Sequence, residues 1–113
     1  MSKRMLIRDI LTKSMNKLDD YNTYKLYYNP MANTLLTYPC ILYKRNSIRQ
    51  RHADNFGYHS YEEYQITIID KRVDSPIIDV LLQNQYCRYS NEYISDNMHH
   101  TILIINTGGL ANG

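Results

Sequence analysis

The chain has 113 residues, of which 43% are hydrophobic and 21% are charged, and its formal net charge is +2. This length suits one domain with a single modest core, and the balance of apolar and charged residues argues against global disorder. So mild a net charge argues against a protein that binds nucleic acid through a strongly basic face.

The first predicted element is a helix over residues 3–18, because its apolar residues recur at spacings of three and four. These residues are Leu6, Ile7, Ile10, Leu11, Met15 and Leu18. Asp9, Lys13 and Lys17 interrupt any apolar stretch that could serve as a signal peptide. No apolar run approaches the ~18 residues that a membrane span needs. We therefore expect no membrane contact and a protein that is made and assembled in a cytoplasm.

Two predicted strands follow, over residues 24–28 and 35–44, and the Asn29-Pro30 turn separates them. In the second strand Pro39 cannot donate a ladder hydrogen bond, which indicates an edge, a bulge or a strand start near that point. Residues 46–60 are polar and show no clean period. They predict a long loop or a hairpin arm between the second and third strands.

The third predicted strand, residues 62–70, alternates clearly between two kinds of side chain. Its apolar positions are Tyr64, Ile66 and Ile68, and its polar positions are Glu63, Gln65 and Thr67. A second helix is expected after Asp74 and Ser75, either of which can cap it, with Pro76 at its first position and its end near Asn84.

Two further strands are predicted, over residues 86–93 and 99–107. Cys87, Tyr89 and Tyr93 are expected to share one face of the first. The element order predicts a single α+β domain over residues 1–107, in which two helices pack on one face of a mainly antiparallel sheet of four to five strands. Residues 108–113 are expected to form a flexible C-terminal tail.

Tyrosine is the unusual feature of the composition, with twelve Tyr, one Phe and no Trp. A tyrosine side chain has a large apolar body and a polar tip, which suits half-buried sheet faces and protein interfaces. The composition therefore favours a protein that makes contacts with other proteins.

No catalytic or nucleotide-binding motif is present, and we expect no cofactor. Cys40, Cys87, His99 and His100 form the best metal candidate, since a Cys2His2 set binds zinc. Adjacent strand residues point to opposite faces, however, so two reduced and partly buried thiols are the simpler interpretation. His52, Asp54 and His59 would be the candidates for a hydrolytic cluster, but the polarity of a loop explains them more simply.

Basic residues are concentrated after the second strand, at Lys44, Arg45, Arg49 and Arg51. They fit three alternatives: a solvated loop, a polar arm that docks on an acidic neighbour, or a surface that faces the phosphates of passing DNA without reading its sequence.

The pairs Asp54-Asn55 and Asp96-Asn97 are predicted to form turns, because both residue types bond to nearby backbone and tolerate turn geometry.

Five short segments, in this order, resemble the small tail-completion proteins of bacteriophages. They are residues 38–43 (YPCILY), 51–55 (RHADN), 64–70 (YQITIID), 74–77 (DSPI) and 95–97 (SDN), the last followed by His100. The resemblance extends over residues 38–106, and none of the motifs is catalytic.

The resemblance implies an α+β subunit of a tail terminator with a long loop or hairpin arm. Such subunits form a hexameric ring on the last ring of the tail tube, stop its growth and present the surface that the head connector binds. On this basis we expect a structural virion protein and not an enzyme. Its partners would be itself, the tail tube protein and the head-tail connector proteins, with non-specific contact to passing DNA through Arg49 and Arg51.

Two alternatives remain open at this point. The first is another ring of the neck, such as a head-completion or connector-adaptor protein. The second is a small DNA-binding module built around the basic residues. In the ring proteins, the residues expected to face an interface or the channel are Lys44, Arg45, Arg49, Arg51, Asp54 and Asn55.

Overall fold

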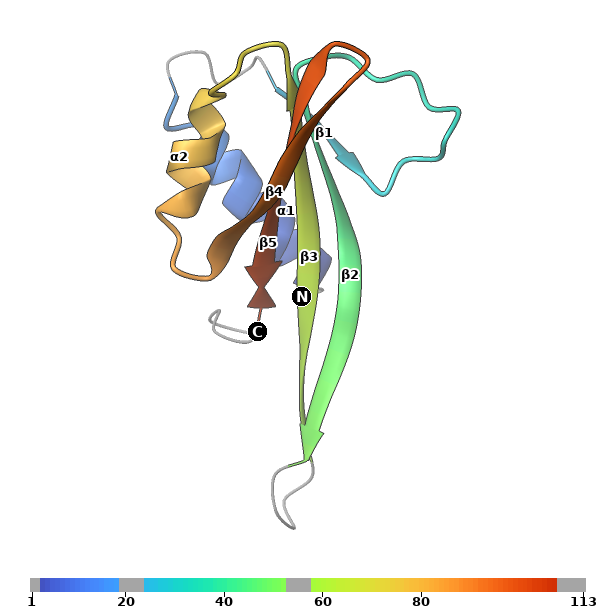
Figure 1. Cartoon of the computed structure of the whole chain (residues 1–113). Helices are drawn as coiled ribbons and strands as arrows, with labels where there is room; N and C mark the ends of the chain where they lie inside the picture. The colour runs from blue at the N-terminus through green and yellow to red at the C-terminus, as the bar shows by residue number, and fades with distance from the viewer. Residues whose placement is uncertain (1–2, 19–23, 53–57, 108–113) are drawn as a thin grey trace.

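A computed structural model describes residues 3–18, 24–52 and 58–107, and it describes residues 47–52 and 58–61 by their backbone alone. The elements in chain order are α1 (Lys3–Met15), β1 (Lys25–Tyr28), β2 (Cys40–His52), β3 (Tyr58–Asp70), α2 (Pro76–Leu82), β4 (Cys87–Ser95) and β5 (Met98–Asn106). The structure confirms the α+β class and the order of the elements (Figure 1).

The five strands form one sheet in the order β1-β2-β3-β5-β4. The pairs β2–β3, β3–β5 and β4–β5 are antiparallel, as expected. β1 instead pairs with β2 in parallel, because residues 29–39 carry the chain back to the level at which β1 began. The sheet is therefore mixed, with β1 and β4 at its two edges.

Both helices contribute to the same hydrophobic core. Ile7 and Leu11 of α1 and Ile77 and Leu81 of α2 are fully buried. They belong to one cluster with alternate residues of the strands, namely Ile41, Tyr43, Tyr64, Ile66, Ile68, Cys87, Leu103 and Ile105. Because alternate residues of a strand lie on one face, this cluster defines the helix-covered face of the sheet, and the other face is called the helix-free face below.

The strand boundaries differ from the prediction at the polar stretch 46–60. A long loop or a hairpin arm was predicted here; β2 continues to His52 and β3 begins at Tyr58, so the described part of this stretch is a paired hairpin arm and not a loop. The polar sequence lacks the alternation of a half-buried strand because neither β1 nor β5 reaches this part of the β2–β3 ladder. The second strand was predicted over residues 35–44, but β2 begins at Cys40, directly after Pro39, so of the edge, bulge or strand start that this proline indicated the structure has the strand start; the Tyr38–Pro39 peptide bond is cis.

The prediction that Tyr93 shares a face of its strand with Cys87 and Tyr89 is also wrong. β4 has a register shift between Tyr89 and Asn91. Tyr89 is paired with the core residue Leu103, whereas Tyr93 is paired with His100 on the other face. A one-residue bulge reverses the alternation of every later residue, which periodicity cannot show.

A buried polar cluster fixes the start of α2. Asp70, at the end of β3, accepts hydrogen bonds on Oδ2 from Ser75 Oγ at 2.8 Å and from Arg72 Nε at 3.0 Å. The hydroxyl of Tyr24 hydrogen-bonds to Ser75 as well. Of the two predicted caps, Asp74 and Ser75, the structure has Ser75 at the N-cap position, but its hydroxyl bonds to Asp70 and not to the first turn of the helix. The cluster therefore joins the residue before β1, the end of β3 and the first turn of α2.

The turn between β4 and β5 confirms the Asp96-Asn97 prediction. Both residues have positive φ, 54° and 61°, as a two-residue hairpin turn of the type that matches strand twist requires.

The two cysteines are buried and unpaired. Cys87 belongs to the main core, and Cys40 lies in a small second cluster with Ile69 and Met98 on the helix-free face. Burial raises the pKa of each thiol to about 11.

Candidate functional site

The C-terminal part of β2 and the N-terminal part of β3 form a two-stranded ribbon. The pairs run from Ile48 with Glu62 to His52 with Tyr58. β5 pairs with β3 only from Glu63 onward, and β1 pairs with β2 only as far as Tyr43. The ribbon therefore extends alone beyond the sheet (Figure 1, green).

A β-bulge marks the point where the ribbon leaves the sheet. The register shifts between Arg45 and Ser47, so Asn46 is the extra residue. Beyond the shift, Arg49 is paired with Tyr61 and Arg51 with His59. The residues of β3 alternate between its two faces without interruption. The register positions of Arg49 and Arg51 are therefore on the same face as Gln65, the partner of Lys44.

The predicted basic residues therefore do not all share one side of β2. Lys44 is paired with Gln65 and is on the helix-free face, whereas Arg45 is paired with the core residue Tyr64. Lys44 and Arg45 are both exposed. Arg49 and Arg51 follow in the ribbon, and Asp54 and Asn55 lie outside the described residues.

Arg45 faces a carboxylate at the base of the ribbon. Its Nη1 lies 3.8 Å from Oε1 of Glu62, and the hydroxyl of Tyr64 donates a hydrogen bond to the same oxygen at 2.6 Å. Burial, together with this neighbouring carboxylate, raises the pKa of Tyr64, so its hydroxyl remains the donor.

The adjacent Glu63 is bound from the other side of the sheet, where Arg88 Nη2 of β4 lies 3.4 Å from its Oε2. The base of the ribbon is thus held by ion pairs to both carboxylates.

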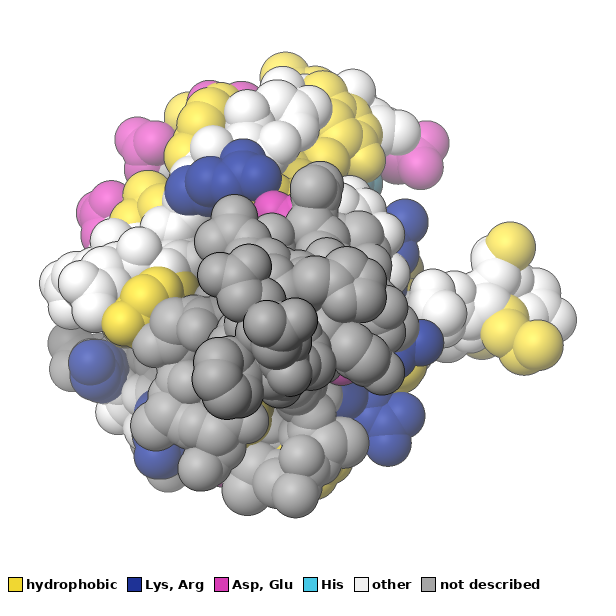
Figure 2. Space-filling view, turned by 90° about the horizontal axis from the view of Figure 1, so that it is seen from below, with side chains coloured by type: hydrophobic (Ala, Val, Ile, Leu, Met, Phe, Trp, Pro, Cys, Tyr) yellow, Lys and Arg dark blue, Asp and Glu magenta, His cyan; other side chains and the backbone are white. Residues whose placement is uncertain are grey.

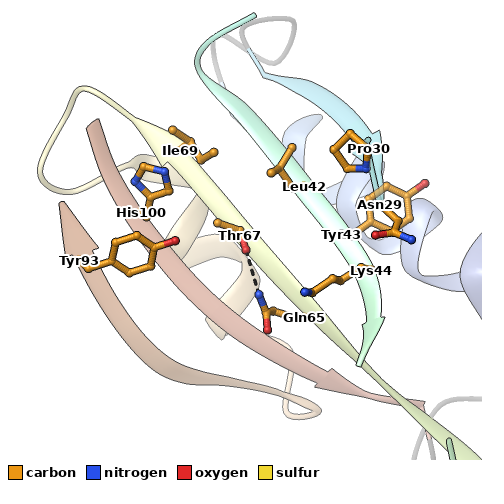
Figure 3. A pocket seen from close by; sticks show the side chains of 10 residues that line it. All are labelled: Asn29, Pro30, Leu42, Tyr43, Lys44, Gln65, Thr67, Ile69, Tyr93 and His100. Carbon is orange, nitrogen blue, oxygen red and sulfur yellow. Dashed lines mark hydrogen bonds between the residues drawn. The ribbon is translucent and has the colours of Figure 1, made fainter. Parts of the chain in front are cut away.

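A shallow groove of about 320 Å³ lies on the helix-free face. Figure 3 shows its lining, which comes from β2, β3, β4 and β5 and from the segment after β1. The residues are Asn29, Pro30, Leu42, Tyr43, Lys44, Gln65, Thr67, Ile69, Tyr93 and His100. The floor mixes apolar and amide or hydroxyl groups, with Gln65 Nε2 donating to Thr67 Oγ1 at 3.4 Å.

One wall of the groove is a pair of stacked rings. The Tyr93 and His100 ring centroids are 4.7 Å apart and the rings are nearly parallel, at 17°. Nδ1 of His100 lies 3.1 Å from the carbonyl oxygen of Met98, which fixes the orientation of the imidazole. The sheet bulge in β4 brings these two rings together, because it turns Tyr93 to the face of its partner His100.

The candidate metal site is not assembled. Cys40 and Cys87 belong to different clusters, and His99 and His100 occupy successive positions of β5 and so lie on opposite faces. Among the side chains that the structure describes, in residues 4–18, 24–46 and 62–107, no group of three or more metal-binding residues is found. His52 and His59 occupy the ribbon strands, and Asp54 falls outside the described residues.

Sequence reasoning did not predict the groove: it gave Gln65 and Thr67 no role in a site, and it considered His100 only as a metal ligand. A signal was present for the first two, because they occupy the polar positions of the alternating third strand. No local signal placed His100 beside Tyr93, because that contact depends on the bulge in β4.

Among the helices that the structure describes, neither is long and apolar enough to cross a membrane. No family model matches the chain, and no curated protein matches it either.

Proposed function

We propose that this chain is a structural subunit of a bacteriophage particle and not a catalyst. It would form a ring, a hexamer by resemblance, at the head-proximal end of the tail, where it ends the tail tube and provides the surface for joining the head. The observation that carries this proposal is the two-stranded ribbon that extends beyond the sheet and carries basic residues.

The ribbon has the properties of an assembly arm. Beyond Tyr43 the outer edge of β2 has no paired strand in the described chain, and neither does the edge of β3 before Glu62, whose own backbone N–H and carbonyl bond to Thr107 Oγ1. Free strand edges offer backbone donors and acceptors to a neighbouring chain. A ribbon that pairs with an adjacent subunit would satisfy these groups and would fix the subunit's orientation in a ring.

The basic residues give the arm a preferred partner. Lys44 and the register positions of Arg49 and Arg51 share one face of the β2–β3 ladder. Opposite charges across an interface steer association and fix its register. In the proposed ring this face would meet an acidic surface of the tail tube protein or a connector protein, or the phosphates of passing DNA. The protein would then be part of the assembled virion.

A second candidate is a head-side neck protein, such as a head-completion or connector-adaptor subunit. The exposed sheet edges and the basic ribbon fit such a ring equally well, because every neck ring needs subunit contacts and borders the DNA path. A DNA-binding module is the third candidate, and Lys44 and Arg45, both exposed, are the described residues that favour it.

Electron microscopy of lysates from phage that lack this gene tests the proposal. We expect filled heads beside overlong tubes or headless tails. Normal joined particles would rule out the tail role, and leaking heads beside free tails of normal length would move the protein to the head side of the neck.

Complementation then identifies the ribbon as the functional part. The wild-type gene should restore joined particles. A gene with charge reversal at Arg49 and Arg51 should fail to restore joined particles. Charge reversal of Lys71, an exposed residue directly after β3, serves as the control and should still allow joined particles to form. Full rescue by the Arg49 and Arg51 variant would refute the role of the basic ribbon.

A further inference from the structure

The groove on the helix-free face collects hydrogen-bond donors that lack acceptors within the described chain. Thr67 is 8% exposed, and its Oγ1 accepts from Gln65 Nε2, but no described residue accepts its hydroxyl hydrogen. The ammonium group of Lys44 forms no ion pair with a carboxylate that the structure describes. The hydroxyl of Tyr93 likewise has no hydrogen-bond partner among the described residues. Three donors of one groove are therefore available to a ligand.

These donors converge on one space. Figure 3 shows the side chains of Lys44 and Tyr93 pointing toward the floor from opposite sides, with Gln65 and Thr67 between them. The lining contains one lysine and no acidic residue. Because a buried donor without an acceptor costs free energy, and because the one formal charge is positive, the floor is suited to an anionic acceptor.

The rest of the lining is apolar or aromatic. Leu42, Ile69 and Pro30 contribute apolar side chains, and the nearly parallel rings of Tyr93 and His100 form one wall. Aromatic rings pack well against a further ring, edge to face or offset. The volume of about 320 Å³ is in the range of pockets that hold small molecules through an apolar lining and a few placed polar groups.

The position of the groove favours a small molecule over a segment of another protein. At Gln65 and Thr67, β3 is paired with β2 on one side and with β5 on the other. The backbone groups of the floor are therefore engaged in the sheet, whereas an extended peptide is bound through the free backbone of a sheet edge. Only side chains are left to recognise the ligand.

We infer that this groove binds a small aromatic carboxylate. The carboxylate would accept hydrogen bonds from Thr67 and Gln65 at the floor and from Lys44 and Tyr93 at the sides. The aromatic body of the ligand would lie against Leu42 and the paired rings. One lysine matches the single charge of a carboxylate. This binding activity goes beyond the proposed role in the particle and does not depend on it.

Titration of the purified full chain with naphthoate, followed by the amide resonances in nuclear magnetic resonance, tests the inference. We expect saturable shifts at Gln65, Thr67 and His100, with a Kd of about 1 mM, which is typical of the binding energy per atom of small ligands. Naphthalenemethanol lacks the charge and acetate lacks the ring, so each should bind about tenfold or more weakly. Absence of saturable shifts at these residues, or equal binding of naphthalenemethanol, would overturn the inference.

Two variants of exposed residues separate the charge from the ring. Lys44→Gln should weaken naphthoate binding about tenfold, because a charge-assisted hydrogen bond is lost. Tyr93→Leu should weaken it about two- to tenfold, because the aromatic wall is lost. Lys13→Gln is the matched control, since it removes the same charge from an exposed position of α1 on the other side of the sheet, and it should bind like the wild type. Wild-type affinity in folded Lys44→Gln, with folding checked by circular dichroism, would refute the role of this lysine and with it the inference.

An acidic peptide tests the other source of the same chemistry. An acetylated Phe-Glu dipeptide amide should bind no more tightly than naphthoate. Binding at least tenfold tighter would overturn the assignment to a small molecule and would make the groove a site for an acidic protein segment. Electron microscopy of phage lacking the gene tests the proposed function separately, so the outcome of either experiment leaves the other open to refutation.

Discussion

At the scale of single residues, Asp70 connects three elements through its two carboxylate oxygens. It is 4% exposed and binds Arg72, Ser75 and Tyr24. Burial works to raise the pKa of this carboxyl, but the hydrogen bonds from Arg72 and Ser75 and the positive charge of Arg72 outweigh it, so the pKa lies below its ordinary value of 3.8.

We expect Asp70→Asn to lower the free energy of unfolding by about 2 kcal/mol at neutral pH, because hydrogen bonds to a charged group and the ion pair with Arg72 are lost. A lowered pKa stabilises the fold above the unfolded-state value of 3.8, and this contribution disappears as the pH falls through the folded-state pKa. The difference between variant and wild type should therefore shrink in acid. Urea unfolding at pH 7 and at pH 3 measures it, with Asp74→Asn, an exposed neighbour, as the control.

The two buried thiols give a second prediction at this scale. With pKa values of about 11, Cys40 and Cys87 should be almost wholly protonated at pH 8, and only the thiolate reacts. Labelling with a maleimide should be slow in the native protein and complete for both residues in denaturant. Rapid native labelling of either one, read by mass spectrometry, would contradict its burial.

At the scale of elements, the two bulges decide which residues share a face. The shift at Asn46 places Lys44 and the register positions of Arg49 and Arg51 on one face, and the shift in β4 places Tyr93 beside His100. Each bulge adds one residue to one strand and thereby reverses the alternation beyond it. The groove and the basic face both depend on these two irregularities.

The β4–β5 turn allows a direct test of element stability. Asp96 and Asn97 both have positive φ, which asparagine and glycine tolerate and β-branched residues do not. Asn97→Gly should leave the free energy of unfolding unchanged or slightly raised, whereas Asn97→Val should lower it by about 1–2 kcal/mol. Thermal and urea unfolding of both variants measures these changes. Equal stability of Asn97→Val and the wild type would show that the turn has ordinary backbone angles.

At the scale of the whole molecule, a compact sheet and helix layer carries two projections. The ribbon extends past the sheet along the direction of β2 and β3, and the turn at residues 31–35 projects beside the β1 edge (Figure 1). The second of these projections carries the exposed side chains of Met31 and Leu35. Figure 2 shows a lobe that projects from the molecule with hydrophobic side chains at its tip.

Shortening the ribbon should leave the rest of the molecule folded. We expect a variant in which Asn-Gly replaces residues 49–61 to keep its melting temperature within a few degrees of the wild type, because beyond Glu62 the β2–β3 ladder has no third strand. Calorimetry measures this. Loss of cooperative unfolding would mean that the ribbon is part of the folding core, and in that case its role in assembly could not be tested by deletion.

The sequence by itself determined the class, the order of the elements, the first position of α2 and the turn at Asp96-Asn97. Each of these follows from interactions between near neighbours in the chain, such as apolar periodicity, the missing N–H of proline or the backbone freedom of asparagine. Only the tertiary structure decided the parallel pairing of β1 with β2, the length of the ribbon and the contact between Tyr93 and His100. These depend on which strands meet and in which register, and one extra residue in a strand changes the face of every side chain that follows it.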